Sequence, residues 1–321
     1  MLQLDEIHNE NFNSKAIEIY NWQRVNIPVY HDYLNLVNRN FPIDCWTKIP
    51  FLPIQFFKSH AILPETKTAE IIFKSSGTGG IRSQHHVEHL PLYEHSFRLN
   101  WTLTYGSVSE KCILALLPNY LSNGDSSLVY MVNDLIQSGI QGSGFYLNDF
   151  EMLKDQLLLN EEKNIPTILI GVTYALMDFA SAFPIPLKNT IIMETGGMNG
   201  TRKELPKNQV HDILKAAFQC NEIHSEYGMT ELLSQAYSKQ NGIFHCPPWM
   251  RVLIRDVSDP YFALPLGKRG GLNIVDLANM NSCSFIETQD IAVTQNYHSF
   301  EILGRVEQAD LRGCNLLVAE A

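Results

Sequence analysis

The spacing of apolar residues first predicts helices near the start of the chain. Residues 13–38 place Ala16, Ile17, Tyr20, Tyr30 and Tyr33 at helical intervals. Pro28 falls in the middle of this run, where it separates two helices or kinks one. The next stretch, 41–58, holds three prolines and is predicted to be extended or irregular. We therefore expect residues 1–70 to form a helical and irregular N-terminal segment.

From Lys111 the pattern alternates between short apolar runs and longer amphipathic ones. Strands are predicted at 112–117, 167–171, 190–194 and 222–225, and helices at 126–137, 150–160, 173–183 and 207–218. A further helix is expected to begin at the turn 227–231. Strands alternating with helices predict a mainly parallel sheet that binds ligands at the carboxyl ends of its strands.

After Trp249 the pattern changes to short strands separated by turn residues. The runs are 251–257, 271–277, 284–293 and 300–306, and they predict a small antiparallel β-subdomain. The resulting division is an N-terminal segment (1–70), an α/β nucleotide-binding core (71–248), a small β-subdomain (249–306) and a C-terminal tail (307–321).

Composition narrows the class of protein. Of the 321 residues, 45% are hydrophobic and 18% charged, which is typical of a globular chain. The net charge of −10 argues against nucleic acid as the main partner. Six scattered cysteines, an N-terminus unlike a signal peptide and no long apolar run predict a cytoplasmic protein with reduced thiols and no membrane span.

The stretch IIFKSSGTGG, residues 71–80, carries the first candidate chemistry. A strand runs into a loop whose glycines let the backbone approach a ligand closely and whose hydroxyls can donate to phosphate oxygens. Successive N–H groups in such a loop can form an anion-binding nest. The residues concerned are Ser75, Ser76, Gly77, Thr78, Gly79 and Gly80. A flexible polar turn is the alternative interpretation.

A second candidate lies at SEYGMTE, residues 225–231. Tyr227 offers an aromatic ring for a purine, Thr230 a hydroxyl for a phosphate, and Glu231 an oxygen ligand for Mg²⁺. The alternative is an ordinary helix start in which the helix dipole favours Glu231.

In this order the motifs resemble those of the adenylate-forming superfamily of acyl-CoA synthetases, adenylation domains and insect luciferases. The resemblance implies that the 75–80 loop binds ATP phosphates and that Gly196 and Gly197 line the adenine pocket. The segment Tyr227, Gly228, Met229, Thr230 and Glu231 then contacts adenine, the α-phosphate and Mg²⁺. Asp290 corresponds to the ribose-binding aspartate, and Arg305 to the arginine that marks the hinge.

The motif sequences and their spacing are most similar to those of the acyl-protein synthetases (long-chain-fatty-acid–luciferin-component ligases) of bacterial bioluminescence. That resemblance covers nearly the whole chain. It implies ATP-dependent activation of a fatty acid to acyl-AMP, then transfer to a cysteine near the C-terminus, matched by Cys314. A thiolate is an effective nucleophile toward an acyl adenylate, and Arg312 would lower the pKa of Cys314. The alternative interpretation is that Cys314 is a small apolar residue at the end of a strand.

The chain departs from the superfamily pattern in two places. The lysine of the phosphate loop is replaced by Ser83, so Arg82, Arg98 and His85 become candidates for the missing positive charge. His85, His86 and His89 otherwise look like a cluster of solvated side chains. Sixteen residues follow Arg305, so the resemblance implies the large domain without its C-terminal lid domain.

Three functions stay open at this point. The first is an acyl-protein synthetase that uses ATP and Mg²⁺ and passes the acyl group to Cys314 or to a reductase- or carrier-type partner. The second is an acyl- or aryl-CoA ligase of the phenylacetate type. The third is a nucleotide-binding subunit with little catalysis of its own.

Overall fold

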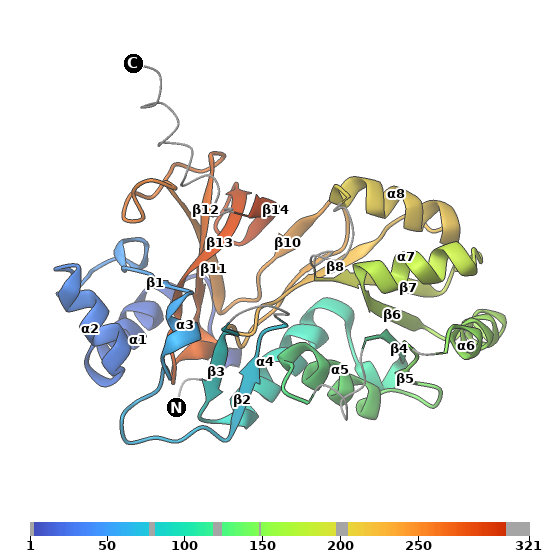
Figure 1. The fold of residues 1–321 in the computed structure, drawn as a ribbon, viewed down its shortest axis with the longest axis horizontal. Helices are drawn as coiled ribbons and strands as arrows, with labels where there is room; N and C mark the ends of the chain where they lie inside the picture. Colours follow the sequence, from blue (N-terminus) through green and yellow to red (C-terminus); the bar gives the residue numbers. More distant parts are fainter. Residues whose placement is uncertain (1–2, 77–80, 118–123, 148, 197–204, 306–321) are drawn as a thin grey trace, which may run out of the picture.

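The computed structural model describes residues 3–76, 81–117, 124–147, 149–196 and 205–305. Within these ranges a twelve-stranded mixed sheet runs through the molecule in the order β11-β12-β13-β14-β10-β9-β8-β7-β6-β4-β5, with β1 paired to β13 (Figure 1). The strands β2 (Ile71–Lys74) and β3 (Gln84–Val87) form a separate two-stranded hairpin.

One half of the sheet is parallel. Its strands are β4 (Cys112–Leu116), β5 (Gly144–Phe145), β6 (Thr167–Val172), β7 (Thr190–Thr195) and β8 (His224–Tyr227). The helices that accompany it are α4 (Leu90–Tyr105), α5 (Ser127–Ser138), α6 (Phe150–Glu162), α7 (Thr173–Ala182) and α8 (Lys207–Phe218).

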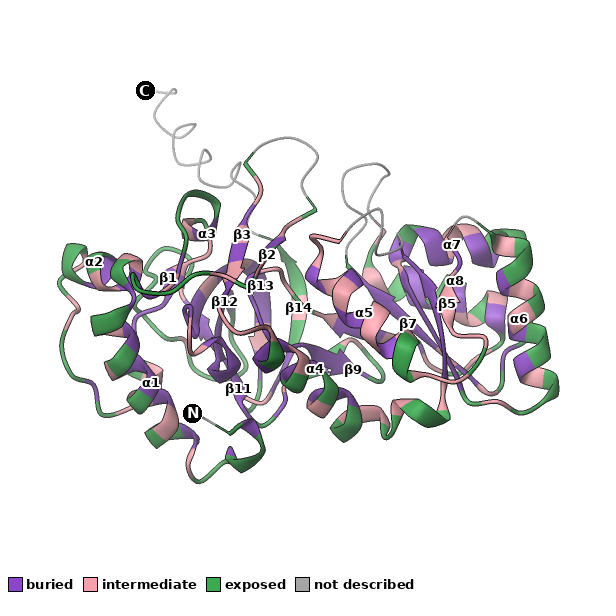
Figure 2. Ribbon diagram, turned by 90° about the horizontal axis from the view of Figure 1, so that it is seen from below, coloured by how far each residue is buried: buried purple, intermediate pink, exposed green. Residues whose placement is uncertain are grey.

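The apolar runs of the parallel strands serve two cores because successive side chains point to opposite faces. Leu114 and Leu169 belong to one cluster with α6, α7 and α8. Ile113 and Ile170 belong to the other, which contains residues of α4 and α5. Burial on both faces explains why β4 and β6 are apolar along nearly all of their length rather than alternating, and Figure 2 shows the neighbouring β7 as mostly buried.

The other half of the sheet is antiparallel. Its strands are β9 (Ala236–Ser238), β10 (Ile243–His245), β11 (Met250–Arg255), β12 (Arg269–Asp276), β13 (Phe285–Thr294) and β14 (Ser299–Arg305). These strands continue the hydrogen-bonded sheet through the β9–β8 and β10–β14 pairs. The four strands predicted after residue 249 are present as β11–β14 and pair antiparallel, but antiparallel pairing already begins at β9, before residue 249. The division into domains stays a prediction.

The N-terminal segment packs on this antiparallel half. It contains η1 (Leu4–Glu6), α1 (Phe12–Asn26), α2 (Pro28–Leu36), η2 (Trp46–Lys48), β1 (Leu52–Pro53) and α3 (Phe56–Ser59). Pro28 occupies the first turn of α2, where its missing N–H costs nothing. The buried Gln23 amide donates to the carbonyls of Asn279 and Met280 and so fixes α1 against η4 (Leu277–Asn279).

The helix expected after Tyr227 is absent, and that prediction was wrong. Residues 228–235 form turns and irregular backbone before β9. The carboxylate of Asp276 on β12 accepts hydrogen bonds from Leu233 N (2.9 Å) and Ser234 Oγ (2.6 Å). A side chain distant in the sequence therefore replaces the helical hydrogen bonds that local spacing suggested.

The fold class predicted from the sequence is confirmed: the structure is an α/β fold with a mixed sheet flanked by helices. In the part of the chain that the structure describes, no helix combines the length and the apolar character needed to cross a bilayer. The remaining 3-10 turn, η3 (Val108–Glu110), leads into β4.

Candidate functional site

Three predicted residues meet where the two halves of the sheet join. The hydroxyl of Tyr227, at the end of β8, donates to Asp290 Oδ2 on β13 at 2.7 Å. Arg305 Nε, at the end of β14, donates to Asp290 Oδ1 at 2.9 Å. The sequence separates Tyr227 from Asp290 by 63 residues, but the mixed sheet brings their side chains into contact.

The ring of Tyr227 is held by two buried aromatic side chains. Phe300 lies 5.2 Å away edge-to-face, and Phe244 lies at 5.6 Å. Burial raises the pKa of Tyr227 well above its ordinary value, and the neighbouring Asp290 carboxylate raises it further. The Tyr227 hydroxyl therefore stays protonated at neutral pH and acts as a hydrogen-bond donor.

The turn 228–231 is fastened from two sides. His85 on β3 directs Nδ1 at the carbonyl oxygen of Thr230 at 2.9 Å, so this nitrogen carries the proton. Asn279 Nδ2 donates to the carbonyl oxygen of Glu231 at 2.7 Å. The Thr230 hydroxyl, in contrast, makes no hydrogen bond with any residue that the structure describes. The backbone of the turn is fixed, and that hydroxyl remains available to a ligand.

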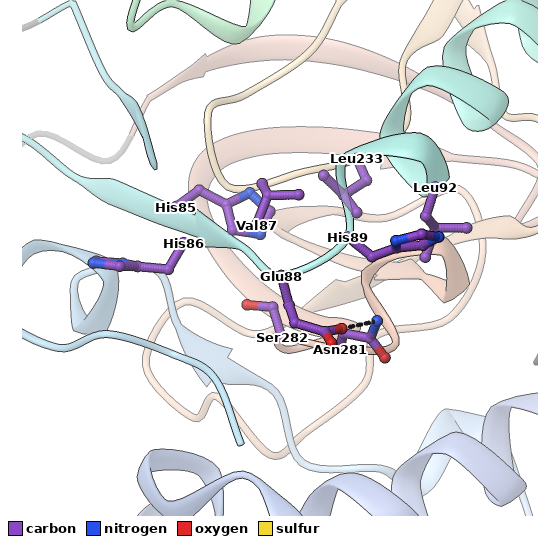
Figure 3. Close-up of a pocket in the computed structure, with 9 residues that line it drawn as sticks. All are labelled: His85, His86, Val87, Glu88, His89, Leu92, Leu233, Asn281 and Ser282. Atoms are coloured by element: carbon purple, nitrogen blue, oxygen red, sulfur yellow. Dashed lines mark hydrogen bonds between the residues drawn. The ribbon is translucent and has the colours of Figure 1, made fainter. Parts of the chain in front are cut away.

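The hydrogen bond to Thr230 leaves His85 Nε2 as an unprotonated acceptor. That atom has no partner among the described residues. It borders a small cavity of about 10 Å³ next to Ser282, whose hydroxyl is also unpartnered (Figure 3). A space of this size suits a single water molecule bound to the two groups.

Glu231 is a buried carboxylate, 5% exposed. Burial raises its pKa, and hydrogen bonding from Ser83 together with the charges of Arg305 and Lys58 opposes that rise. A carboxylate in such surroundings gains stability when a cation binds, so its chemistry fits the Mg²⁺ role assigned to it. In the described residues no cluster of three or more His, Cys, Asp or Glu side chains could by itself hold a metal ion.

The base of the 75–80 loop, which is predicted to bind phosphate, is fixed by the β2–β3 hairpin. Ser75 N donates to Ser83 O at 3.0 Å, and Ser83 N donates to Ser75 Oγ at 3.0 Å. Arg82 donates to the carbonyls of Ser75 and Lys74 and pairs with Asp125 at 3.2 Å. The two ends of the loop are therefore held together. The exposed Ser76 precedes residues 77–80, which lie outside the described residues.

Gly196 directly follows β7 and lies near the end of β8, since its neighbour Thr195 is paired with Glu226 in the sheet. It adopts a positive φ of 71°, which favours glycine. Its carbonyl accepts a hydrogen bond from Thr173 Oγ1 at 3.0 Å. The predicted partner Gly197 lies outside the described residues, as does Cys314.

Two buried carboxyl groups at this edge escaped the sequence interpretation. Burial opposes ionisation of Glu194, but His211 and Lys207 outweigh it and lower the pKa to about 2; Lys207 Nζ lies 2.7 Å from Glu194 Oε1. Glu226 makes no ion pair with any of the described residues. Burial raises its pKa to about 7, although it accepts a hydrogen bond from Thr195.

A residue signal for Glu194 and Glu226 existed in the sequence. Each is the next-to-last residue of a strand, at the edge where a parallel sheet binds ligands. The pairing of Glu226 with Thr195 and of Glu194 with Lys207 depends on strand order, which the residues alone did not give.

The structure corrects two expectations about the cationic side chains. His85 is 1% exposed, and burial lowers its pKa to about 4, so it is neither solvated nor a cation at neutral pH. Arg98 on α4 pairs with Asp134 on α5. Arg82 is the candidate that remains beside the loop, where its guanidinium binds the backbone at the base of the loop.

Comparison with known proteins adds the class of fold. No protein-family model and no curated protein matches the sequence. ATP-bound MatB from Rhodopseudomonas palustris is similar in structure, with a TM-score of 0.54 and 18% identity over 73% of this chain and 47% of that one. An open conformation of 2-hydroxyisobutyryl-CoA ligase in complex with 2-HIB-AMP and CoA gives a TM-score of 0.66 and 10% identity over 93% and 70%.

The fold is therefore that of the large domain of adenylate-forming enzymes. The chain spans about half the length of the MatB structure. Sequence identities this low establish a similar fold and do not establish a shared reaction.

Proposed function

We propose that this chain uses ATP to activate a carboxylic acid as its acyl adenylate and then transfers the acyl group to a thiol. The observation that carries the proposal is the contact of Tyr227 with Asp290 and of Asp290 with Arg305. These residues were selected from the order of their motifs alone, and they converge at one edge of a sheet whose fold is that of adenylate-forming enzymes.

In the first step a carboxylate oxygen of the acid attacks the α-phosphorus of ATP. The bond between that phosphorus and the oxygen bridging to the β-phosphate breaks, and pyrophosphate leaves. Asp290 accepts hydrogen bonds from the ribose hydroxyls, while the ring of Tyr227 lies against adenine. The Thr230 hydroxyl donates to an α-phosphate oxygen, and hydroxyl and N–H groups of the 75–80 loop bind the other phosphates.

A divalent cation at Glu231 would neutralise negative charge on the phosphates. Glu231 is suited to hold it because its carboxylate is buried and makes no ion pair with any residue that the structure describes. Arg305 stays on Asp290, where it fixes the orientation of the carboxylate.

In the second step a thiolate attacks the acyl carbon, a thioester forms and AMP leaves. We propose Cys314 as the thiol, with a fatty acid as the substrate and a reductase- or carrier-type protein as the final acceptor. The resemblance to acyl-protein synthetases supports this choice. A cytoplasmic setting with reduced thiols is part of the same proposal.

A CoA ligase is the second candidate, because one structural relative, 2-hydroxyisobutyryl-CoA ligase, was solved in complex with 2-HIB-AMP and CoA. In that case CoA supplies the thiol and Cys314 has no role in transfer.

Intact-mass spectrometry after incubation with Mg-ATP and a panel of carboxylic acids tests the proposal. We expect a mass increase equal to one acyl group that hydroxylamine removes and that Cys314→Ala abolishes. Cys220→Ala is the matched control and should retain the adduct. Acyl-CoA formed equally by wild type and Cys314→Ala would instead establish the CoA ligase. Absence of AMP with every acid would contradict both.

A further inference from the structure

A large groove lies away from the residues assigned to the nucleotide. It has a volume of about 1080 Å³ and lies between residues 39–51, which follow α2, and the β11–β12 hairpin with its connecting residues 260–265. It is at the end of the molecule that carries α1 and α2 (Figure 1). Small-molecule sites usually measure roughly 300–1,000 Å³, so the groove has room for a sizeable organic ligand.

The floor of the groove is a sheet face with an unsatisfied polar group. Asn273 on β12 is 1% exposed, and its Oδ1 has no partner among the described residues. Arg255 on β11 lies beside it but is already bound, to Thr288 O at 2.9 Å and to Glu287 at 3.2 Å. An acceptor left unpaired inside a protein is costly, and a water molecule in the groove would satisfy Asn273.

The walls of the groove are apolar and unusually exposed. Phe262 is 56% exposed, Phe41 48% and Tyr261 38%, although all three line the same space. Isolated exposed apolar residues are common, but contiguous ones at a concave surface indicate a binding site. Their combined surface suits the apolar part of a ligand.

One cation at the groove, Arg39, has no acidic partner in the part of the chain that the structure describes. Arg39 lies over the ring of Tyr261 at 4.3 Å and makes no side-chain hydrogen bond or ion pair with any described residue. Lys48 is already neutralised by Asp44 at 2.9 Å. Arg255 is likewise neutralised by Glu287. The uncompensated charge at the groove is therefore positive and is located on Arg39.

We propose that this groove binds an amphipathic carboxylic acid at a site separate from the one that holds the nucleotide. The anionic head binds Arg39, which is always charged and presents several donors to a carboxylate. The apolar body lies against Phe41, Tyr261 and Phe262. Tyr227, Asp290 and Arg305 do not line the groove, so occupancy does not require a vacant nucleotide site.

Fluorescence titration of the full chain with 11-(dansylamino)undecanoate tests this site. We expect saturable binding that decanoate displaces and that decyltrimethylammonium does not. Saturating ATP should leave the binding within about twofold. Phe262→Asp should weaken the probe at least about tenfold because it places a negative charge on the apolar wall. Arg39→Gln should weaken it about tenfold through loss of a charge-assisted contact.

Two matched variants control for surface effects. Leu103→Asp also introduces an acid at an exposed apolar position, with Leu103 59% exposed on α4. Lys163→Gln removes an exposed cation far from the groove. Both should bind the probe like wild type. Wild-type affinity in Phe262→Asp and Arg39→Gln would overturn the proposal, as would complete displacement of the probe by ATP or no binding to the wild-type protein.

Discussion

The two halves of the sheet use polar residues in opposite ways. In the parallel half, β4 is buried along its whole length and carries no charge, whereas Glu194 and Glu226 stand near the carboxyl ends of β7 and β8. In the antiparallel half, charged residues such as Asp276 and Asp290 lie within or at the end of buried strands and are fixed by hydrogen bonds. The candidate site forms where the carboxyl ends of the parallel strands meet the hydrogen-bonded aspartates of the antiparallel half.

The largest expected effect concerns the link between the halves. Asp276→Ala removes the acceptor for Leu233 N, Ser234 Oγ and Ala278 N, all of which are buried. Leaving buried donors unpaired should lower the free energy of unfolding by roughly 3–5 kcal/mol. Urea unfolding measures this change. Asp212→Ala, at an exposed position of α8, is the control, and an equally small loss in both variants would show that the two halves are joined in another way.

The next effect separates the two carboxyl groups of the parallel half. Because burial raises the pKa of Glu226 to about 7 from 4.5, its contribution to stability is fully present below pH 4.5 and is lost as the pH rises through 7. Glu226→Gln abolishes this titration, so wild type should lose about 3 kcal/mol relative to the variant between pH 4.5 and 8.

Unfolding free energies of both proteins across that range provide the measurement. Glu194, whose pKa lies near 2, should give no comparable titration between pH 4.5 and 8 when it is replaced by Gln. A pH-independent difference between wild type and Glu226→Gln would contradict the assignment.

A smaller effect is expected when the hydrogen bond that holds the turn 228–231 is removed. His85→Ala removes the hydrogen bond to the Thr230 carbonyl and should lower kcat for adenylate formation about tenfold, with a smaller change in KM for ATP. His86, the next residue on β3, extends in the opposite direction from His85 in Figure 3 and is the natural control. Equal kcat values for the His85→Ala and His86→Ala variants would mean that the turn does not depend on His85.

The smallest effect is expected for Arg98, which sequence reasoning included among the candidates for phosphate charge. Its ion pair with Asp134 lies on partly exposed helix surfaces, where such pairs contribute roughly 0–1 kcal/mol. Arg98→Met should therefore leave the KM for ATP within twofold and lower stability by less than about 1 kcal/mol. A tenfold rise in the KM for ATP would instead show that Arg98 contributes to nucleotide binding.

Local patterns were sufficient for most elements and for the order of the site motifs. The apolar runs around Leu114 and Ile170 predicted parallel strands because burial on both faces removes polar residues from them. The prediction of a helix at Glu231 was wrong because Asp276, which is remote in the sequence, accepts a hydrogen bond from the backbone N–H of Leu233 there. His85 was misjudged for the same reason, since its partner Thr230 is 145 residues away.

The central claim is that Tyr227, Asp290 and Arg305 form part of an adenylate-forming site. Acid-dependent exchange of radiolabelled pyrophosphate into ATP tests it most directly. The account predicts exchange by wild type with at least one carboxylic acid, and a loss of kcat/KM for ATP of about 100-fold in Asp290→Ala with unchanged circular dichroism. Undiminished exchange in Asp290→Ala, or no exchange by wild type with any acid, would contradict it.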